Sequence, residues 1–260
     1  NSSSSETSGP SYYAQATEAY GQVVNSIVRP PRCNYEMTNL GPAGFDFVGR
    51  RFKRIDMSLL NPRGQNLACS HWQPLNHDPN TDDSLPCVIY MHGNSSARIE
   101  ALPILSMVLS MGATLFAFDF AGSGHSDGDW VSLGVYEKDD LASVISYLRL
   151  PTSGVSTIAL WGRSMGAATA ILHSERDPSI AGMVLDSAFS DLETLAEEIV
   201  DKGRKQGLFA PSLLVSIAIR FIRSSVKNKA KFDIKDLSPI SVVNKCYVPA
   251  LFVAAVNDQF

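Results

Sequence analysis

A glycine-flanked serine is the feature of this sequence that most directly suggests chemistry. Gly162, Ser164 and Gly166 match the pattern G-x-S-x-G, in which a nucleophilic serine sits on a sharp turn between a strand and a helix. An apolar strand pattern at residues 157–161 precedes the motif, and small side chains that suit a helix start follow it. We therefore predict that Ser164 is a nucleophile and that the two glycines let the strand and the helix approach each other.

A second loop could supply the other groups that acyl transfer to a serine requires. His92, Gly93 and Asn94 follow a short apolar run at 87–91. A glycine at position 93 lets the loop turn so that the Asn94 amide points inward, and the Met165 amide at the helix start would be a second donor. We expect these two amides to bind the oxyanion of a tetrahedral intermediate. The imidazole of His92 is expected to pack against the backbone.

The acid that would orient a histidine base is expected after a later strand, because serine, acid and histidine follow in this order when such a turn belongs to a triad. Asp258 fits this expectation, since it comes shortly after the apolar run 250–255. Asp186, at the end of the run 183–185, is the alternative. We predict Asp258 as the acid.

The histidine base is not evident in the sequence. None of the five histidines follows Asp258. His125, in a loop after the predicted strand 114–118, could approach the site but would break the expected order. We therefore expect the chain to be a fragment, with the last strand, helix and histidine loop beyond Phe260.

The rest of the chain supplies the elements that could position these residues. Short apolar runs alternate with amphipathic helix patterns, which is typical of βαβ units and a parallel sheet. Helices are predicted at 102–111, about 141–148 and 166–173, and strands at 52–60, 66–73, 87–91, 114–118, 157–161, 183–185 and 250–255. The predicted fold class is α/β, with a mostly parallel central sheet flanked by helices.

Two stretches fall outside this alternation. Residues 1–50 are predicted to form an N-terminal arm that is disordered over its serine-rich first ten residues and helical before Pro30. Residues 51–260 are predicted to form the main domain, with 187–249 inserted as a helical cap. Helices are expected to start in this cap near Ser190 and near Pro211.

Part of the predicted cap is strongly basic. Residues 202–235 carry nine Lys and Arg and a single acid, Asp233. Together with the apolar face of the helix that starts near Pro211, this charge would suit contact with a membrane surface or a pocket for an anionic substrate. A solvated outer face of the cap is the alternative.

The composition argues against several other classes of protein. The 260 residues hold 22 Lys and Arg against 26 Asp and Glu, and a net charge of −4 argues against a nucleic-acid-binding protein. The four cysteines form no C-x-x-C pair, which argues against a zinc or disulfide scaffold and suits a cytoplasmic setting. The uncharged run 101–118 contains Pro103 and Gly112, so it is predicted as helix, turn and strand rather than a membrane span. No pattern implies a metal or an organic cofactor.

Taken together, these residues resemble the α/β-hydrolase superfamily, and most closely its serine aminopeptidase-like branch, which also holds monoacylglycerol lipases and esterases. The resemblance covers about residues 50–260 and rests on 91–94, Asp119 with 122–126, 161–166, 185–187 and the region of Asp258. It implies Ser164 as nucleophile, Asp258 as acid, Asn94 and Met165 as oxyanion donors, and 187–249 as the cap. One departure is Ala255, because the family usually has glycine three residues before the acid.

The resemblance implies a serine hydrolase that cleaves an ester, thioester or amide bond through an acyl-enzyme, with a small acyl or peptide substrate. A capped, partly apolar site favours acyl esters and thioesters over peptides, although the fold alone does not set the substrate. A catalytically inactive hydrolase fold that acts as a binding or scaffold protein is the first alternative. A lipid binder that uses residues 202–235 is the second. The sequence indicates no oligomeric state.

Overall fold

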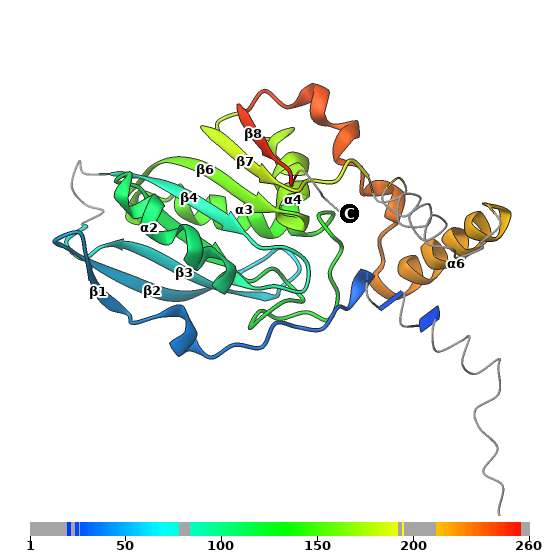
Figure 1. The fold of residues 1–260 in the computed structure, drawn as a ribbon, viewed down its shortest axis with the longest axis horizontal. Coiled ribbons are helices and arrows are strands. Elements are labelled where there is room, and N and C mark those ends of the chain that lie inside the picture. Colours follow the sequence, from blue (N-terminus) through cyan, green and yellow to red (C-terminus); the bar gives the residue numbers. More distant parts are fainter. Residues whose placement is uncertain are drawn as a thin grey trace, which may run out of the picture.

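The computed structural model describes residues 20, 21, 24, 25, 27–77, 84–191, 194 and 212–255. The first ten residues, most of the first predicted cap helix and Asp258 lie outside this part of the chain. The described residues are organised around an eight-stranded sheet in the order β1-β2-β3-β5-β4-β6-β7-β8 (Figure 1).

The sheet joins an antiparallel part to a parallel part. Strands β1, β2 and β3 pair antiparallel with one another, and β3 pairs antiparallel with β5. Strands β5, β4, β6, β7 and β8 run parallel, which confirms a mostly parallel sheet. Parallel neighbours bring their carboxyl ends to one edge of the sheet. The bounds are β1 Gly44–Phe47, β2 Arg50–Leu60, β3 Asn66–Pro74, β4 Leu85–Met91, β5 Thr114–Phe118, β6 Val155–Arg163, β7 Gly182–Asp186 and β8 Ala250–Val253.

Helices cover both faces of this sheet. Figure 1 shows α2 (Leu102–Ser110) on one face and α3 (Glu137–Leu148) with α4 (Met165–Ser174) on the other. All five residues of β5 are buried, and they alternate between two hydrophobic cores: Leu115 and Ala117 belong to the core on the α2 side, and Phe116 and Phe118 to the core on the α3 and α4 side. This two-sided burial explains why β5 reads as a continuous apolar run.

The helix that starts near the predicted Pro211 is α6 (Ser212–Ala230), and it stands clear of the sheet (Figure 1). The predicted strands and the predicted helices at 102–111, about 141–148, 166–173 and near Pro211 are present, with ends that differ by a few residues. Strand β1 was not predicted. Its four residues alternate between exposed and half-buried, and they pair with β2 at the edge of the sheet. The sequence therefore has no run of buried apolar residues there.

Part of the N-terminal arm is packed into the same structure. Val24 and Val28 are buried in the core on the α3 and α4 side. Arg32 donates hydrogen bonds to the carbonyls of Gly124, Ser126 and Gly128, so it holds the loop after β5.

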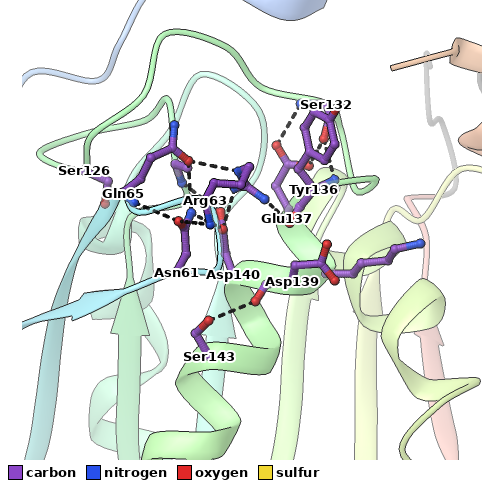
Figure 2. A network of polar contacts seen from close by, with 12 residues as sticks. Asn61, Arg63, Gln65, Ser126, Ser132, Tyr136, Glu137, Asp139, Asp140 and Ser143 are labelled. Atoms are coloured by element: carbon purple, nitrogen blue, oxygen red, sulfur yellow. Dashed lines mark hydrogen bonds and ion pairs between the residues drawn. The ribbon is translucent and has the colours of Figure 1, made fainter. Parts of the chain in front are cut away.

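A buried polar network ties α3 to the antiparallel part of the sheet (Figure 2). Asp140 accepts hydrogen bonds from Asn61 Nδ2 at 2.7 Å, from Arg63 at 2.6 Å and from the Ala121 amide at 3.0 Å. Burial raises the pKa of Asp140 to about 6, although the Arg63 guanidinium acts in the opposite direction. One carboxylate thus joins the β2–β3 turn, the loop after β5 and the first turn of α3.

Within the described residues, no helix is both long and apolar enough to cross a lipid bilayer.

Candidate active site

Ser164 lies between β6, which ends at Arg163, and α4, which begins at Met165. Its backbone has φ 50° and ψ −110°, a combination that residues other than glycine rarely adopt. The conformation is held from both sides, because the Ser164 amide donates to the Asp186 carbonyl at 2.8 Å and the Ser164 carbonyl accepts from the Ala168 amide at 2.9 Å. The turn is therefore a strained strand-to-helix elbow, as the sequence pattern predicts.

The two glycines of the motif are required by close backbone contacts. A Cβ on Gly162 would lie 2.3 Å from the Gly166 carbonyl carbon and oxygen. A Cβ on Gly166 would lie 2.1 Å from the carbonyl oxygen of Met91, at the end of β4. No other residue type fits either position without moving the backbone. The second contact also places the elbow directly against β4.

The side chain of Ser164 is half buried, and its Oγ makes no hydrogen bond with any residue that the structure describes. It sits at the carboxyl edge of the sheet, beside the first turn of α4. Met165 is the first residue of that helix, so its amide has no carbonyl one turn earlier to bind. The Ser164 hydroxyl and the Met165 amide thus lie next to each other, and in the described part of the chain neither is bound to a group that holds the fold.

The loop after β4 is braced by His92, whose side chain is fully buried. The Phe120 amide lies 3.1 Å from His92 Nε2, so Nε2 must accept and the ring proton must be on Nδ1. Nδ1 then donates to the Gly93 carbonyl at 2.7 Å. The prediction that this imidazole packs against the backbone is confirmed.

This bracing sets the direction of the Asn94 amide. The Gly93 carbonyl also accepts from the Ser96 amide at 3.2 Å. The carbonyl of Gly93 and the N–H of Asn94 belong to one trans peptide unit, so they point in opposite directions. The Asn94 N–H therefore points away from the His92 ring, and it has no partner within the described part of the chain. A Cβ on Gly93 would lie 3.7 Å from the Arg163 carbonyl oxygen, which brings this loop next to the elbow.

One residue at this loop was not found from the sequence. Glu100 accepts a hydrogen bond from the Gly93 amide at 3.1 Å. It lies in the 3-10 helix Arg98–Ala101, and its only signal in the sequence is an acidic residue in a first helical turn, which usually has no function beyond a favourable helix dipole.

All five histidines are in the described part of the chain, and none is hydrogen-bonded to Ser164. His125 stacks on the Tyr35 ring at 4.3 Å between ring centroids, and its Nε2 lies 2.9 Å from the Tyr35 carbonyl. His71 bonds to Thr114, and His173 bonds to the Lys138 carbonyl and to Asp177. These contacts of the His125 ring with the N-terminal arm argue against His125 as the base, which the chain order also disfavours.

Of the two candidate acids, only Asp186 can be described. Its Oδ1 accepts from Ser187 Oγ at 3.0 Å, and its carbonyl holds the Ser164 amide. Asp258 lies outside the described residues. Strand β8 ends at Val253, which is the register partner of Asp186, so the chain leaves the sheet at the edge that carries Ser164.

The loop motif around Asp119 has a structural task. Asp119 is fully buried and accepts hydrogen bonds from the Tyr35 hydroxyl at 2.7 Å, the Arg98 amide at 2.6 Å and the His125 amide at 2.8 Å. Gly124 has φ 45°, and a Cβ there would lie 2.4 Å from Asp119 Oδ2. This carboxylate therefore joins the N-terminal arm to the end of β5. In the part of the chain that the structure describes, no group of three or more His, Cys, Asp or Glu side chains could hold a metal ion.

The described part of the predicted basic segment uses several of its charges internally. Arg223 and Lys227 both pair with Asp233, at 2.5 Å and 3.7 Å, and Lys229 donates to Asn25. The contacts with Arg223 and Lys227 lower the pKa of Asp233 to about 2, with the Arg223 hydrogen bond as the main cause. Phe221 of α6 is 62% exposed.

Comparison with known proteins agrees with this geometry. The family model for serine aminopeptidase, S33 matches residues 85–240, a stretch that runs from the start of β4 through the elbow and past α6.

This chain matches only part of the length of each individual relative. YqkD, an uncharacterized protein of Bacillus subtilis (strain 168), is 29% identical over 200 residues, which is 76% of this chain and 61% of YqkD. A monoglyceride lipase homolog of Monkeypox virus is 24% identical over 161 residues, which is 60% of this chain and 55% of that protein. The chain thus spans about three fifths of the length of these relatives.

Among solved structures, the esterase Pf2001 of Pyrococcus furiosus matches with a TM-score of 0.57 and 24% identity. The match covers 87% of this chain and 76% of that one. At this level of identity the similarity concerns the fold, and the two chains share the α/β-hydrolase fold.

Proposed function

Because the chain belongs to the serine aminopeptidase S33 family of α/β-hydrolases, we propose that it is a serine hydrolase that cleaves an ester, thioester or amide bond through an acyl-enzyme. The observation that carries this proposal is Ser164. Its backbone is held in a strained conformation between two glycines that no other residue can replace, while its hydroxyl forms no hydrogen bond with the residues that the structure describes. Strain of this kind persists where the surrounding structure enforces it, and it is common at active sites.

In the proposed reaction, Ser164 Oγ attacks the carbonyl carbon of the substrate and its proton passes to a histidine base. The amides of Asn94 and Met165 stabilise the oxyanion of the tetrahedral intermediate, each by about 3 kcal/mol. The intermediate expels the alcohol, thiol or amine, which takes the proton from the histidine. Water then attacks the acyl-enzyme by the same steps and releases the acid.

We assign the orienting acid to Asp258, and the base to a histidine outside these 260 residues. What supports the second assignment is that none of the five histidines present is hydrogen-bonded to Ser164, and that the rings of His71, His92, His125 and His173 have other partners. Esters and thioesters are the proposed substrates, in preference to peptides, and residues 187–249 are the proposed cap. The names of the relatives, an esterase and a monoglyceride lipase homolog, describe those proteins and agree with this choice.

The rival function is a binding or scaffold protein with an inactive hydrolase fold, and the same lack of a histidine beside Ser164 favours it. The two proposals differ in their response to a fluorophosphonate, which reacts with activated serines. We expect the full native chain to be labelled and Ser164→Ala not to be labelled, with an unchanged melting temperature. Equal labelling of both proteins would refute Ser164 as nucleophile, and no labelling of either would favour the scaffold.

A further inference from the structure

The carboxylate of Glu100 lies where β4, the loop that follows it and the elbow meet. Its Oε1 accepts hydrogen bonds from the Gly93 amide at 3.1 Å and from the Tyr90 hydroxyl at 3.0 Å. Its Oε2 lies 3.5 Å from the guanidinium of Arg163, the residue before Ser164. The Glu100 side chain is 14% exposed. One side chain thus contacts both halves of the proposed catalytic centre.

These contacts determine the backbone conformation of Gly93. Glu100 holds the amide on one side of this residue, and the His92 ring and the Ser96 amide hold the carbonyl on the other. Glycine has the widest choice of backbone angles of any residue. Fixing both neighbouring peptide units therefore fixes the direction of the next N–H, which belongs to Asn94.

We propose that Glu100 is a positioning residue, which aims the Asn94 amide at the oxyanion by holding the Gly93 amide. This inference rests on the proposed function, because it concerns the same tetrahedral intermediate. The oxyanion exists only in the transition state and the intermediate, so correct aim of the donor affects kcat and has little effect on substrate binding.

A negative charge close to a developing oxyanion would oppose catalysis if it were not balanced. Arg163 balances it through the ion pair with Glu100. Tyr90 contributes a hydrogen bond, and burial together with the neighbouring Glu100 carboxylate raises the pKa of Tyr90, so the phenol stays protonated and donates. The three side chains form one unit that holds the loop and leaves little net charge.

The test compares two substitutions of Glu100 in the full native chain, with p-nitrophenyl acetate as the probe substrate. Glu100→Ala removes the acceptor, and we expect kcat to fall ten- to a hundred-fold with KM within about two-fold, since a whole oxyanion donor is worth about 10²- to 10³-fold. Glu100→Gln keeps an acceptor for the Gly93 amide, so we expect kcat within about three-fold of the wild type. Glu175→Gln, which removes a carboxylate paired with Lys245 elsewhere, is the control and should change neither constant.

A fluorophosphonate separates positioning from loss of folding. If Glu100 aims the donor, Glu100→Ala reacts more slowly but reaches the same final labelled fraction. If kcat falls only in proportion to that final fraction, Glu100 is merely structural and the inference is wrong.

Should Glu100→Ala not fold, Tyr90→Phe and Arg163→Gln replace it. We expect each to lower kcat about three-fold at constant KM, and an unchanged kcat in both would overturn the inference.

The failures can be told apart. A wild-type protein whose activity depends on Ser164 but not on Glu100 overturns the positioning role alone. A wild-type protein without Ser164-dependent labelling overturns the proposed function and this role with it.

Discussion

The backbone conformation of Ser164 has a cost that its neighbours must offset. A residue other than glycine with φ near 50° and ψ near −110° is destabilised by about 1–3 kcal/mol. Pairing with Asp186 and the first hydrogen bond of α4 offset this cost, and Gly162 and Gly166 let β4, β6 and α4 come close enough to form them. The geometry of Ser164 therefore depends on the lack of a Cβ atom at positions 162 and 166.

The glycine requirement can be tested with one added methyl group. Gly162→Ala should lower the free energy of unfolding by about 3 kcal/mol, because its Cβ would lie 2.3 Å from the Gly166 carbonyl group. Gly182→Ala in the adjacent β7 is a matched control, since its Cβ would be 3.6 Å from the nearest atom, the Pro249 carbonyl oxygen. We expect the control to change stability by about 0.5 kcal/mol. Urea unfolding measures both, and equal losses would contradict the proposed packing.

At the scale of elements, buried charges hold the parallel and antiparallel parts of the sheet together. The pKa of Asp140, raised to about 6 by burial, lies above the 3.8 of the free side chain. Between these values the folded protein binds more protons than the unfolded chain, so the contribution of this group to stability falls as the pH rises. Above pH 6 the carboxylate is charged, and it then depends on Arg63.

This dependence predicts a pH-sensitive effect of removing Arg63. Arg63→Met loses the contacts with Gln65 and Tyr136 at every pH, but it loses the ion pair with Asp140 only where Asp140 is charged. We expect the loss in unfolding free energy to be about 2 kcal/mol larger at pH 8 than at pH 5. Thermal melts at the two pH values measure the difference.

Arg63→Lys is the control for that experiment. It keeps the positive charge and loses only the forked geometry, so its loss should be nearly the same at both pH values. A pH-independent loss for Arg63→Met as well would show that Asp140 does not titrate with this partner.

The sequence predicted the elements whose burial follows a simple pattern. Strand β5 was predicted with its observed ends, because four of its five residues are apolar and all five are buried. The elbow was predictable because two glycines at a fixed spacing around a serine indicate that the backbones of the strand and the helix lie close together there. Strand β1 was not, since an edge strand is held by pairing with its neighbour and needs no apolar pattern.

Buried acids were the other feature that the sequence could not reveal. Glu100 and Asp140 read as ordinary surface charges, because carboxylates rarely lie away from water unless several donors surround them. Asp119 belongs to the motif that carries the family resemblance, but the sequence did not show that it is buried or which groups donate to it. Several donors to Asp119 and Asp140 come from residues distant in sequence, as in the bond from Tyr35 to Asp119. Only the folded chain brings these partners together. The nucleophile Ser164 could therefore be predicted from the sequence, but the side chains that hold the loops around it could not.

At the scale of the whole molecule, the described part of the proposed cap carries a basic region on and after α6. α6 stands apart from the sheet (Figure 1), with Phe221 exposed. Asp233 and Asn25 engage Arg223, Lys227 and Lys229. The other described cations of this region are Arg220, Lys231 and Lys235, and all three are exposed.

We propose that this region contacts anionic lipid, with Phe221 as an apolar anchor and the exposed cations as the charge. Each cation near an anionic surface contributes about 1 kcal/mol, so Arg220→Gln with Lys235→Gln should weaken binding to phosphatidylserine vesicles about thirty-fold. Arg50→Gln with Arg51→Gln, two exposed cations on β2, is the charge-matched control and should bind like the wild type. Co-sedimentation at low and high salt measures the effect, since an electrostatic contact weakens as the Debye length shortens. If binding changes neither with salt nor with the substitutions of Arg220 and Lys235, or if no binding occurs, the charges on this face of the proposed cap serve only to keep it solvated.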